Sequence, residues 1–339
     1  MAGIDLHSNN LFCGIVDEDG RQVFEKKLPC DLGRVAAALK PFKSRLDTVA
    51  VESTYNWYWL VDGLQDYGYR VALANPAKIK QYDGLKHGND KSDAFFLAEL
   101  LRLKILPTGH ICDRELRPVR DLLRRRMGLV QKRTSVMLSL KSLYTRMTGK
   151  QMELRRLKEL EPRHAESLFD HPADQLITRL DLQLLEQLNE AVSKIEKTIL
   201  ATVKHISYYQ VLQTMPGVGI ILGLTITLET VDPKRFATAG DYASYCRCVD
   251  SQRVSNGKKK GENNGKCGNK YLAWAFVEAA NFARRHDEHC RKFYDRKAAQ
   301  TNAMVATKAL ACKLAKAAWH MMSQGVAYDV RRIFPEARA

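Results

Sequence analysis

The sequence has no apolar segment long enough to cross a membrane. Its longest apolar run lies near residues 220–228, whereas a spanning helix needs about 20 apolar residues. The N-terminal residues Met1-Ala2-Gly3-Ile4-Asp5 lack the basic and apolar regions of a signal peptide. The eight cysteines also lack the spacing of a disulfide scaffold, which is typical of proteins kept reduced. These absences argue against a membrane or disulfide-stabilised secreted protein, and we expect a cytoplasmic protein with no membrane partner.

Negative charge is scarce relative to positive charge. The chain has 38 Asp+Glu against 54 Lys+Arg, which gives a formal net charge of +16 and a pI near 9.5. Such an excess favours a polyanionic partner, because each phosphate neutralised by a cation releases bound counterions. Nucleic acid is therefore the favoured partner, with an anionic membrane surface second.

Residues 1 to about 104 alternate between strand and helix patterns. The expected order is β-β-β-α-β-α-β-α, with a hairpin turn at Asp19-Gly20 and helices near residues 32–42, 57–67 and 91–104. This is the order of the ribonuclease-H-like fold. We therefore predict an α/β domain over residues 1–112. Because many α/β folds share parts of this order, it does not by itself imply an activity.

Residues 113–206 lack strand patterns and predict a helical linker. Its second helix carries apolar residues at the alternating spacing of a coiled-coil seam, namely Leu185, Leu188, Val192, Ile195, Ile199 and Ile206. Two explanations remain open. The seam could pair with a second copy of the chain, or the helix could pack within its own chain.

The first helix of this linker is strongly basic. Between residues 114 and 133 there are eight Lys/Arg against two acids. Arg117, Arg120 and Arg124 share one helical face, a spacing suited to following a phosphate backbone. A solvated charged face would have a similar pattern, but the imbalance of sign favours nucleic-acid contact.

Residues 207–339 predict a mostly helical third domain that is interrupted by one polar loop. The loop spans residues 253–270 and contains six cations, one carboxylate and four glycines. Such a composition cannot bury a core, so the loop is either solvated or ordered on a ligand.

Four acids of the first domain are candidates for a metal site. Asp5 lies on the first strand, Glu52 ends a later strand, and Asp90 and Asp93 share one face at the start of a helix. The predicted fold brings these acids together, and a divalent cation such as Mg²⁺ or Mn²⁺ would offset their repulsion. Taken singly, each has another explanation: Asp90 could be a helix N-cap, Asp93 could favour the helix dipole, Asp5 could cap a turn, and Glu52 could be a surface residue.

Several segments resemble the DEDD insertion-sequence transposases of bacteria, recombinases guided by a structured noncoding RNA called the bridge RNA. In the first half they are G-I-D-L-H at 3–7, V-A-V-E-S-T-Y at 49–55, A-N-P-A-K-I-K at 74–80 and N-D-K-S-D-A at 89–94. In the second half they are T-M-P-G-V-G at 214–219, R-F-A-T-A-G-D-Y-A-S-Y at 235–245 and the segments S-N-G-K-K-K-G and K-C-G-N-K-Y-L around 255–272. The segments span nearly the whole chain in order.

The resemblance implies a first domain like the Holliday-junction resolvase RuvC that binds Mg²⁺ through Asp5, Glu52, Asp90 and Asp93. It also implies a C-terminal transposase domain whose serine forms a covalent phosphoserine link to DNA, and this serine corresponds best to Ser255. The chain departs from the family in having Asn256-Gly257 where two glycines often follow the serine, and in lacking the usual Gly and Pro before it. Ser251 is therefore the alternative nucleophile.

The resemblance further implies partners and an assembly. They are donor and target DNA, a guide RNA, and dimers or tetramers in which different protomers complete an active site. A serine nucleophile needs an electropositive pocket for the phosphate, and Lys258, Lys259 and Lys260 could supply part of it. We therefore expect an RNA-guided DNA recombinase. The alternatives are a metal-dependent structure-selective nuclease that uses water, and a non-catalytic nucleic-acid-binding protein.

Overall fold

The computed structural model describes residues 1–79, 89–249, 253–261 and 267–334. The chain forms two compact units. One consists of Met1–Ile111 together with Ser251–Cys267, and the other of Cys112–Asp250 together with Gly268–Ala339. The second stretch of the first unit falls within the C-terminal domain that the sequence predicts. The domain boundaries expected at residues 112 and 206 stay predictions.

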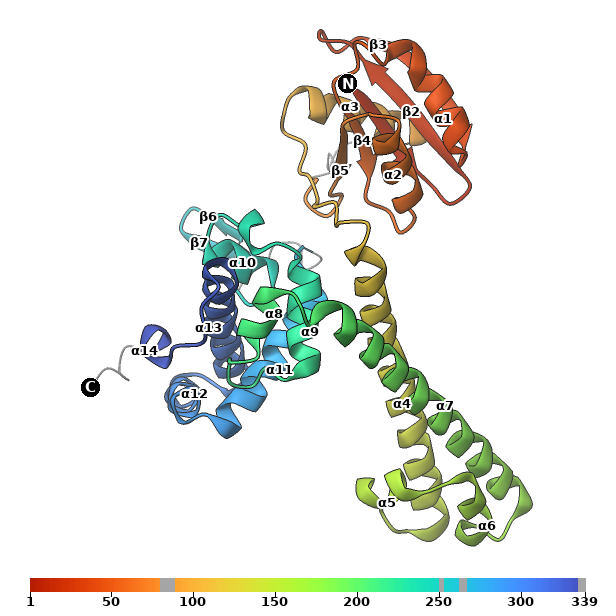
Figure 1. Ribbon diagram of the computed structural model, residues 1–339, viewed down its shortest axis with the longest axis vertical. Helices are drawn as coiled ribbons and strands as arrows, with labels where there is room; N and C mark the ends of the chain where they lie inside the picture. Colours follow the sequence, from red (N-terminus) through yellow and green to blue (C-terminus); the bar gives the residue numbers. More distant parts are fainter. Residues whose placement is uncertain (80–88, 250–252, 262–266, 335–339) are drawn as a thin grey trace. The chain divides into compact units, whose positions relative to one another are not determined.

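A mixed five-stranded sheet forms the first unit (Figure 1). Its spatial order is β3-β2-β1-β4-β5, with antiparallel pairing from β3 to β1 and parallel pairing from β1 to β5. The strands are β1 (Ala2–Leu6), β2 (Asn10–Val16), β3 (Gln22–Pro29), β4 (Val49–Glu52) and β5 (Val71–Ala74). This arrangement confirms the ribonuclease-H-like fold predicted from the order of elements.

The two faces of this sheet are covered by different helices. The helices α1 (Leu32–Leu39) and α2 (Tyr58–Asp66) contribute to the main core of the unit, together with Ala2, Ile4 and Leu6 of β1. The helix α3 (Asp90–Arg102) packs on the other face, against β1, β2 and β4. Side chains alternate between the faces of a strand, so Gly3 and Asp5 of β1 lie on the α3 side.

Gly3 allows α3 to approach the sheet very closely. A Cβ atom at Gly3 would lie 2.0 Å from the carbonyl oxygen of Ala94 and 2.7 Å from the backbone nitrogen of Ala98. Any larger residue would therefore force α3 away from β1. The close contact fixes the start of α3, where Asp90 and Asp93 lie, next to the strand that carries Asp5.

The second unit is mostly helical, as predicted. Its long helices α4 (Leu116–Thr148) and α7 (Pro172–Val203) pack side by side along an extended arm (Figure 1). Short helices connect them, namely α5 (Leu154–Glu159), the 3-10 turn η2 (Pro162–His164) and α6 (Ala165–Leu168). The remaining helices are α8 (Ser207–Leu212), α9 (Ile220–Thr230), η3 (Pro233–Arg235), α10 (Ala239–Tyr245), α11 (Lys270–His286), α12 (Glu288–Gln300), α13 (Ala303–Gln324) and α14 (Val330–Ile333).

The apolar seam of α7 is covered within its own chain. Leu185 is buried in a cluster with Leu140 and Leu143 of α4, and Ile199 is buried in a cluster with Leu123 of α4 and Leu228 of α9. Leu188 and Val192 are buried as well. The structure therefore favours the second of the two explanations, packing within the chain, because heptad spacing shows that a helix has an apolar face but not which helix covers it.

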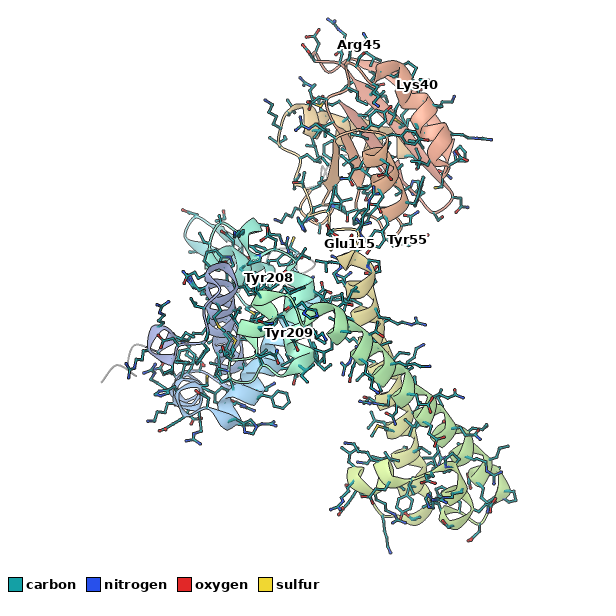
Figure 2. All side chains as sticks on the ribbon, in the orientation of Figure 1. Lys40, Arg45, Tyr55, Glu115, Tyr208 and Tyr209 are labelled. Carbon is teal, nitrogen blue, oxygen red and sulfur yellow. The ribbon has the colours of Figure 1, made fainter. Side chains whose placement is uncertain are left out.

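The helix α8 connects two cores of the second unit through adjacent tyrosines (Figure 2). Tyr209 is buried with residues of α4, α7 and α9, whereas Tyr208 packs against the larger cluster formed by α10, α11 and α13. The Tyr208 hydroxyl also donates a hydrogen bond to the carbonyl oxygen of Val231, just after α9 (2.5 Å). The base of the arm and the C-terminal helices are thus joined through continuous packing. None of the helices in the described ranges is both long and apolar enough to span a bilayer.

Candidate functional site

The four predicted acids come from elements whose ends meet on the α3 side of the sheet. Asp5 lies on β1 and is only 3% exposed. Glu52 is the last residue of β4, the parallel neighbour of β1. Asp90 and Asp93 lie in the first turn of α3. The acids influence one another: the charges of Asp5 and Asp93 act on Glu52, and those of Asp5 and Asp90 act on Asp93.

A histidine that the sequence analysis did not identify completes this cluster. The Nε2 atom of His7 lies 3.1 Å from Oδ2 of Asp5 and 3.2 Å from Oδ1 of Asp90. One ligand atom from each of these three residues lies within 4.8 Å of the others. His7 follows Asp5 by two residues, the spacing that puts side chains on the same side of an extended chain, and this was the available signal.

The local charges divide the acids into two groups. Burial, the hydrogen bond with Asp5 and the charges of Asp5 and Asp93 together raise the pKa of Glu52 to about 7, although the charge of His7 lowers it. Burial together with the charges of Asp5 and Asp90 also raises the pKa of Asp93. Desolvation acts in the same upward direction on Asp90, but hydrogen bonds from His7 and Lys27 outweigh it and lower the pKa of Asp90. The cluster therefore holds more negative charge than its protein partners offset.

The carboxylate of Asp5 is buried next to His7, but one of its oxygens is not satisfied by a hydrogen bond from the described residues. Its Oδ2 atom is buried and receives no well-aligned hydrogen bond from the residues that the structure describes. A buried acceptor without a donor is costly, and a divalent cation satisfies several carboxylate oxygens at once. The donor set of acid oxygens around this orphaned atom fits such a cation.

The start of α3 leaves Asp90 available to this site. Asn89, not Asp90, is the N-cap of the helix: its side chain accepts from the backbone nitrogen of Ser92, whose hydroxyl accepts from the backbone nitrogen of Asn89. This capping box removes the alternative explanation that Asp90 caps the helix. The Asp90 carboxylate instead faces His7 and Lys27 of β3, whose Nζ lies 3.4 Å from its Oδ2.

The backbone of His7 is held from two sides. Its nitrogen donates to the carbonyl oxygen of Asn10 (2.9 Å), and its carbonyl oxygen accepts from Nδ2 of Asn56 (2.9 Å). Asn56 in turn accepts a hydrogen bond from Thr54 (2.8 Å), two residues after Glu52. The loop after β4 is therefore tied to the end of β1. Its Tyr55 is 83% exposed at the surface of the first unit (Figure 2).

Ser255 lies at the tip of a short hairpin. The strands β6 (Arg253–Ser255) and β7 (Lys258–Gly261) are antiparallel, with Ser255 opposite Lys258. Asn256 and Gly257 between them have φ angles of 51° and 70°, as a type I′ turn requires. A second glycine is therefore not needed at position 256, since asparagine also adopts this conformation.

The hairpin presents its polar side chains to solvent. Ser255, Lys258 and Lys260 are exposed, and Lys259 lies on β7. Ser251, the alternative nucleophile, lies outside the described residues. The segment Ser251–Cys267, which contains the hairpin, belongs to the same compact unit as the sheet. At the end of this segment the thiol of Cys267 donates a hydrogen bond to the carbonyl oxygen of Ala77 (3.3 Å).

The proposed phosphate-contacting face of α4 is corrected by the structure. Arg117 is buried, and its Nη2 donates to the carbonyl oxygen of Cys112 (2.8 Å). Arg124 forms two hydrogen bonds of 2.7 Å with the buried carboxylate of Glu229 on α9. Both guanidinium groups therefore stabilise the second unit, while Arg120 between them in sequence is half-buried. The sign imbalance was misleading, because Glu229, the acid that Arg124 contacts most closely, lies 105 residues away in the sequence.

Two family models match the chain. One, described as a transposase of the DEDD type of IS110, matches residues 2–148, and another, described as "Transposase IS116/IS110/IS902 family", matches residues 209–295. The first covers the sheet with all four acids, and the second covers α9 to α11 with the hairpin.

Individual relatives are distant but extend over most of the chain. The transposase for insertion sequence element IS1111A of Coxiella burnetii is 24% identical over 97% of this chain and 91% of its own length. The transposase for insertion sequence element IS1328 of Yersinia enterocolitica is 23% identical over 97% of this chain and 98% of its own length. The Sinorhizobium fredii protein y4qE is 26% identical over 73% of this chain, and the match covers 61% of that relative.

Proposed function

The chain belongs to the IS110 family of DEDD transposases, and on this premise we propose that it is a metal-dependent serine recombinase that moves an insertion sequence. Transposases of this kind cut and join DNA, and the excess of positive charge suits such a substrate. The observation that supports the metal-dependent step most strongly is the convergence of Asp5, His7 and Asp90 around a buried carboxylate oxygen to which no described residue donates a well-aligned hydrogen bond.

Asp5, Glu52, Asp90 and Asp93 would hold the divalent cation, Mg²⁺ or Mn²⁺. When bound, such a cation polarises a phosphoryl oxygen and stabilises the charge that develops on it. Asp5 contributes a fixed buried oxygen, and Asp90 is oriented by the capped start of α3. Without the cation, burial and the nearby acids raise the pKa of Glu52 to about 7, and a bound cation would favour its ionised form.

Ser255 would be the nucleophile. Its Oγ forms a bond to the phosphorus of the scissile phosphodiester, the bond from phosphorus to the leaving deoxyribose oxygen breaks, and the hydroxyl proton passes to a base. A hydroxyl of the joining strand then reverses these events and releases the serine. The exposed tip of the hairpin makes Ser255 accessible to DNA, and Lys258 and Lys260 next to it favour the negative phosphate.

The partners follow from the family resemblance. Base pairing with a structured noncoding RNA would select donor and target DNA, while the protein binds both backbones. Active sites would be completed in a dimer or tetramer. Since α4 covers the seam of α7, the contact between copies would use surfaces other than this seam.

A denaturing gel tests the proposal. The full-length protein is incubated with Mg²⁺, the noncoding RNA of its own element and labelled cognate DNA, beside Ser255→Ala, Ser251→Ala and Asp5→Asn. We expect a covalent protein–DNA adduct in the parent and in Ser251→Ala, and none in Ser255→Ala or Asp5→Asn. An adduct that survives in Ser255→Ala and disappears in Ser251→Ala would move the nucleophile to Ser251.

The two alternatives give different results in the same experiment. Cut DNA without an adduct in any variant would indicate a metal-dependent nuclease that uses water. DNA binding that is unchanged by Asp5→Asn, with no cutting under any condition, would indicate a non-catalytic nucleic-acid-binding protein.

A further inference from the structure

We infer that His7 is a nitrogen ligand of the divalent cation, and that it makes the site prefer Mn²⁺ to Mg²⁺. The inference rests on the proposed function, because it concerns the same cation site. It assigns to His7 a role in choosing the metal that the four acids alone do not have.

The geometry around His7 fits coordination. Its Nε2 lies 3.1 Å from Oδ2 of Asp5 and 3.2 Å from Oδ1 of Asp90. In an octahedral shell with bonds of about 2.1 Å, neighbouring ligand atoms lie roughly 3.0 Å apart, and opposite ones roughly 4.2 Å apart. Both distances to His7 match the neighbouring case. The three ligand atoms all lie within 4.8 Å of one another, so the oxygens of Asp5 and Asp90 can occupy either neighbouring or opposite positions of the octahedron.

The contacts of Asp5 and Asp90 leave the relevant oxygens available. Oδ2 of Asp5 is buried, and in the described part of the chain no residue donates a well-aligned hydrogen bond to it, although His7 lies close by. Lys27 approaches the other oxygen of Asp90, Oδ2, and leaves Oδ1 facing His7. A cation located between these atoms would bind both carboxylates and the imidazole at once. A hydrogen bond from His7 could satisfy only one of the two carboxylates.

His7 is also positioned for this role before a cation binds. Its backbone nitrogen is bonded to the carbonyl oxygen of Asn10, and its carbonyl oxygen to Asn56. Ligands fixed by such surrounding contacts lose little freedom on binding. The side chain remains 46% exposed, so a cation can reach it from solvent.

The identity of the donor atom sets the metal preference. Mg²⁺ is a hard ion that favours oxygen ligands and retains its water, whereas affinities of sites with nitrogen ligands rise along the first-row transition ions. One imidazole among carboxylates therefore favours Mn²⁺ over Mg²⁺. Removing it should reduce Mn²⁺ affinity by about tenfold or more, since even loss of an outer contact to a ligand costs 10–100-fold.

The test uses the full-length protein with Mn²⁺ alone. Calorimetric titration measures Mn²⁺ and Mg²⁺ affinities, and pulsed electron paramagnetic resonance of bound Mn²⁺ detects an imidazole nitrogen by its nuclear modulation. The variants are His7→Ala, His7→Gln, which supplies an oxygen donor instead, and Asp5→Asn. His205→Ala is the matched control, because His205 is exposed in the second unit.

We expect nitrogen modulation in the parent and in His205→Ala, and none in His7→Gln, which still binds Mn²⁺ but with a reduced preference over Mg²⁺. Modulation absent from the parent, with Mn²⁺ binding lost in Asp5→Asn, would overturn the role of His7 and leave the metal site intact. Mn²⁺ binding unchanged in Asp5→Asn would overturn the metal site itself, and the inference with it.

Discussion

The ion pair between Arg124 and Glu229 makes a sharp prediction about the stability of the second unit. The Glu229 side chain is 1% exposed and accepts two hydrogen bonds from Arg124 and one from Nδ2 of Asn269, each of 2.7 Å. The Arg124 guanidinium also lies 4.8 Å from the ring centre of Tyr271. Burial opposes the charged form of Arg124, but the hydrogen bonds and charge of Glu229 outweigh it and raise the pKa of Arg124.

Arg124→Met retains most of the side-chain volume but leaves the Glu229 carboxylate buried with one donor. Removing one partner of a buried ion pair costs about 3–5 kcal/mol, because the remaining charge is uncompensated. The double variant Arg124→Met, Glu229→Gln removes both charges and should regain most of that stability. Arg125→Met is the matched control: Arg125 is exposed on the same helix, and its loss should change stability by no more than about 0.5 kcal/mol.

Amide hydrogen exchange measured by mass spectrometry reports this effect locally, on peptides from α9. In Arg124→Met we expect protection to fall by roughly 100-fold to several-thousand-fold, and to be largely restored in the double variant. Unchanged protection together with weaker DNA binding and a smaller salt dependence would refute this reasoning. That result would mean that Arg124 contacts phosphate, as its position on the basic face of the helix had indicated.

Three further predictions concern the first unit and the arm. Because burial and the neighbouring acids raise the pKa of Glu52 from its ordinary 4.5 to about 7, the metal-free protein should lose stability as pH rises from about 4.5 through 7, and Glu52→Gln should reduce this dependence in melting curves recorded with a chelator. Gly3→Ala should destabilise the first unit by about 1–3 kcal/mol and weaken Mn²⁺ binding, because its Cβ would lie 2.0 Å from a carbonyl oxygen of α3. Gly128→Ala, which has open space around it on α4, should instead stabilise the arm by up to about 1 kcal/mol. Equal effects of the two substitutions in thermal melts would contradict the packing described. Asn56→Ala should lower Mn²⁺ affinity by about tenfold in calorimetry, because His7 loses the bond that holds its carbonyl, and an unchanged affinity would show that this bond does not position the ligand.

The acids could be predicted from sequence because their positions follow from simple rules. Asp5 and Glu52 lie on neighbouring parallel strands, and an alternating side-chain pattern together with a helix start is enough to bring Asp90 near them. His7 was missed because its spacing from Asp5 indicates only a shared side of the extended chain, whereas its role depends on the distances from its ring to two carboxylates. Sequence patterns predicted that the acids lie together, but they did not predict that Asp5 and Asp90 share His7 as a neighbour.

The errors in the second unit have a common physical origin. The seam of α7 and the basic face of α4 were both identified as features of single helices, but their partners are distant in the sequence. Glu229 is the one charged residue of α9, and only the packing of α9 against α4 shows that it neutralises Arg124. In the same way, α4 covers apolar residues of α7 that a second copy could equally have covered.

The division of the first unit into two stretches of chain has a consequence for its synthesis. All five strands and α3 lie within Met1–Ile111, whereas the serine segment Ser251–Cys267 follows after about 140 residues of the other unit. At a translation rate of about 5–20 residues per second, roughly 7–28 s separate the two on the ribosome. A nascent chain can therefore assemble its acidic cluster well before the hairpin emerges from the exit tunnel. In the proposed mechanism the newborn protein could hold a metal ion during that interval but could not yet attack DNA, so the order of translation itself delays its activity.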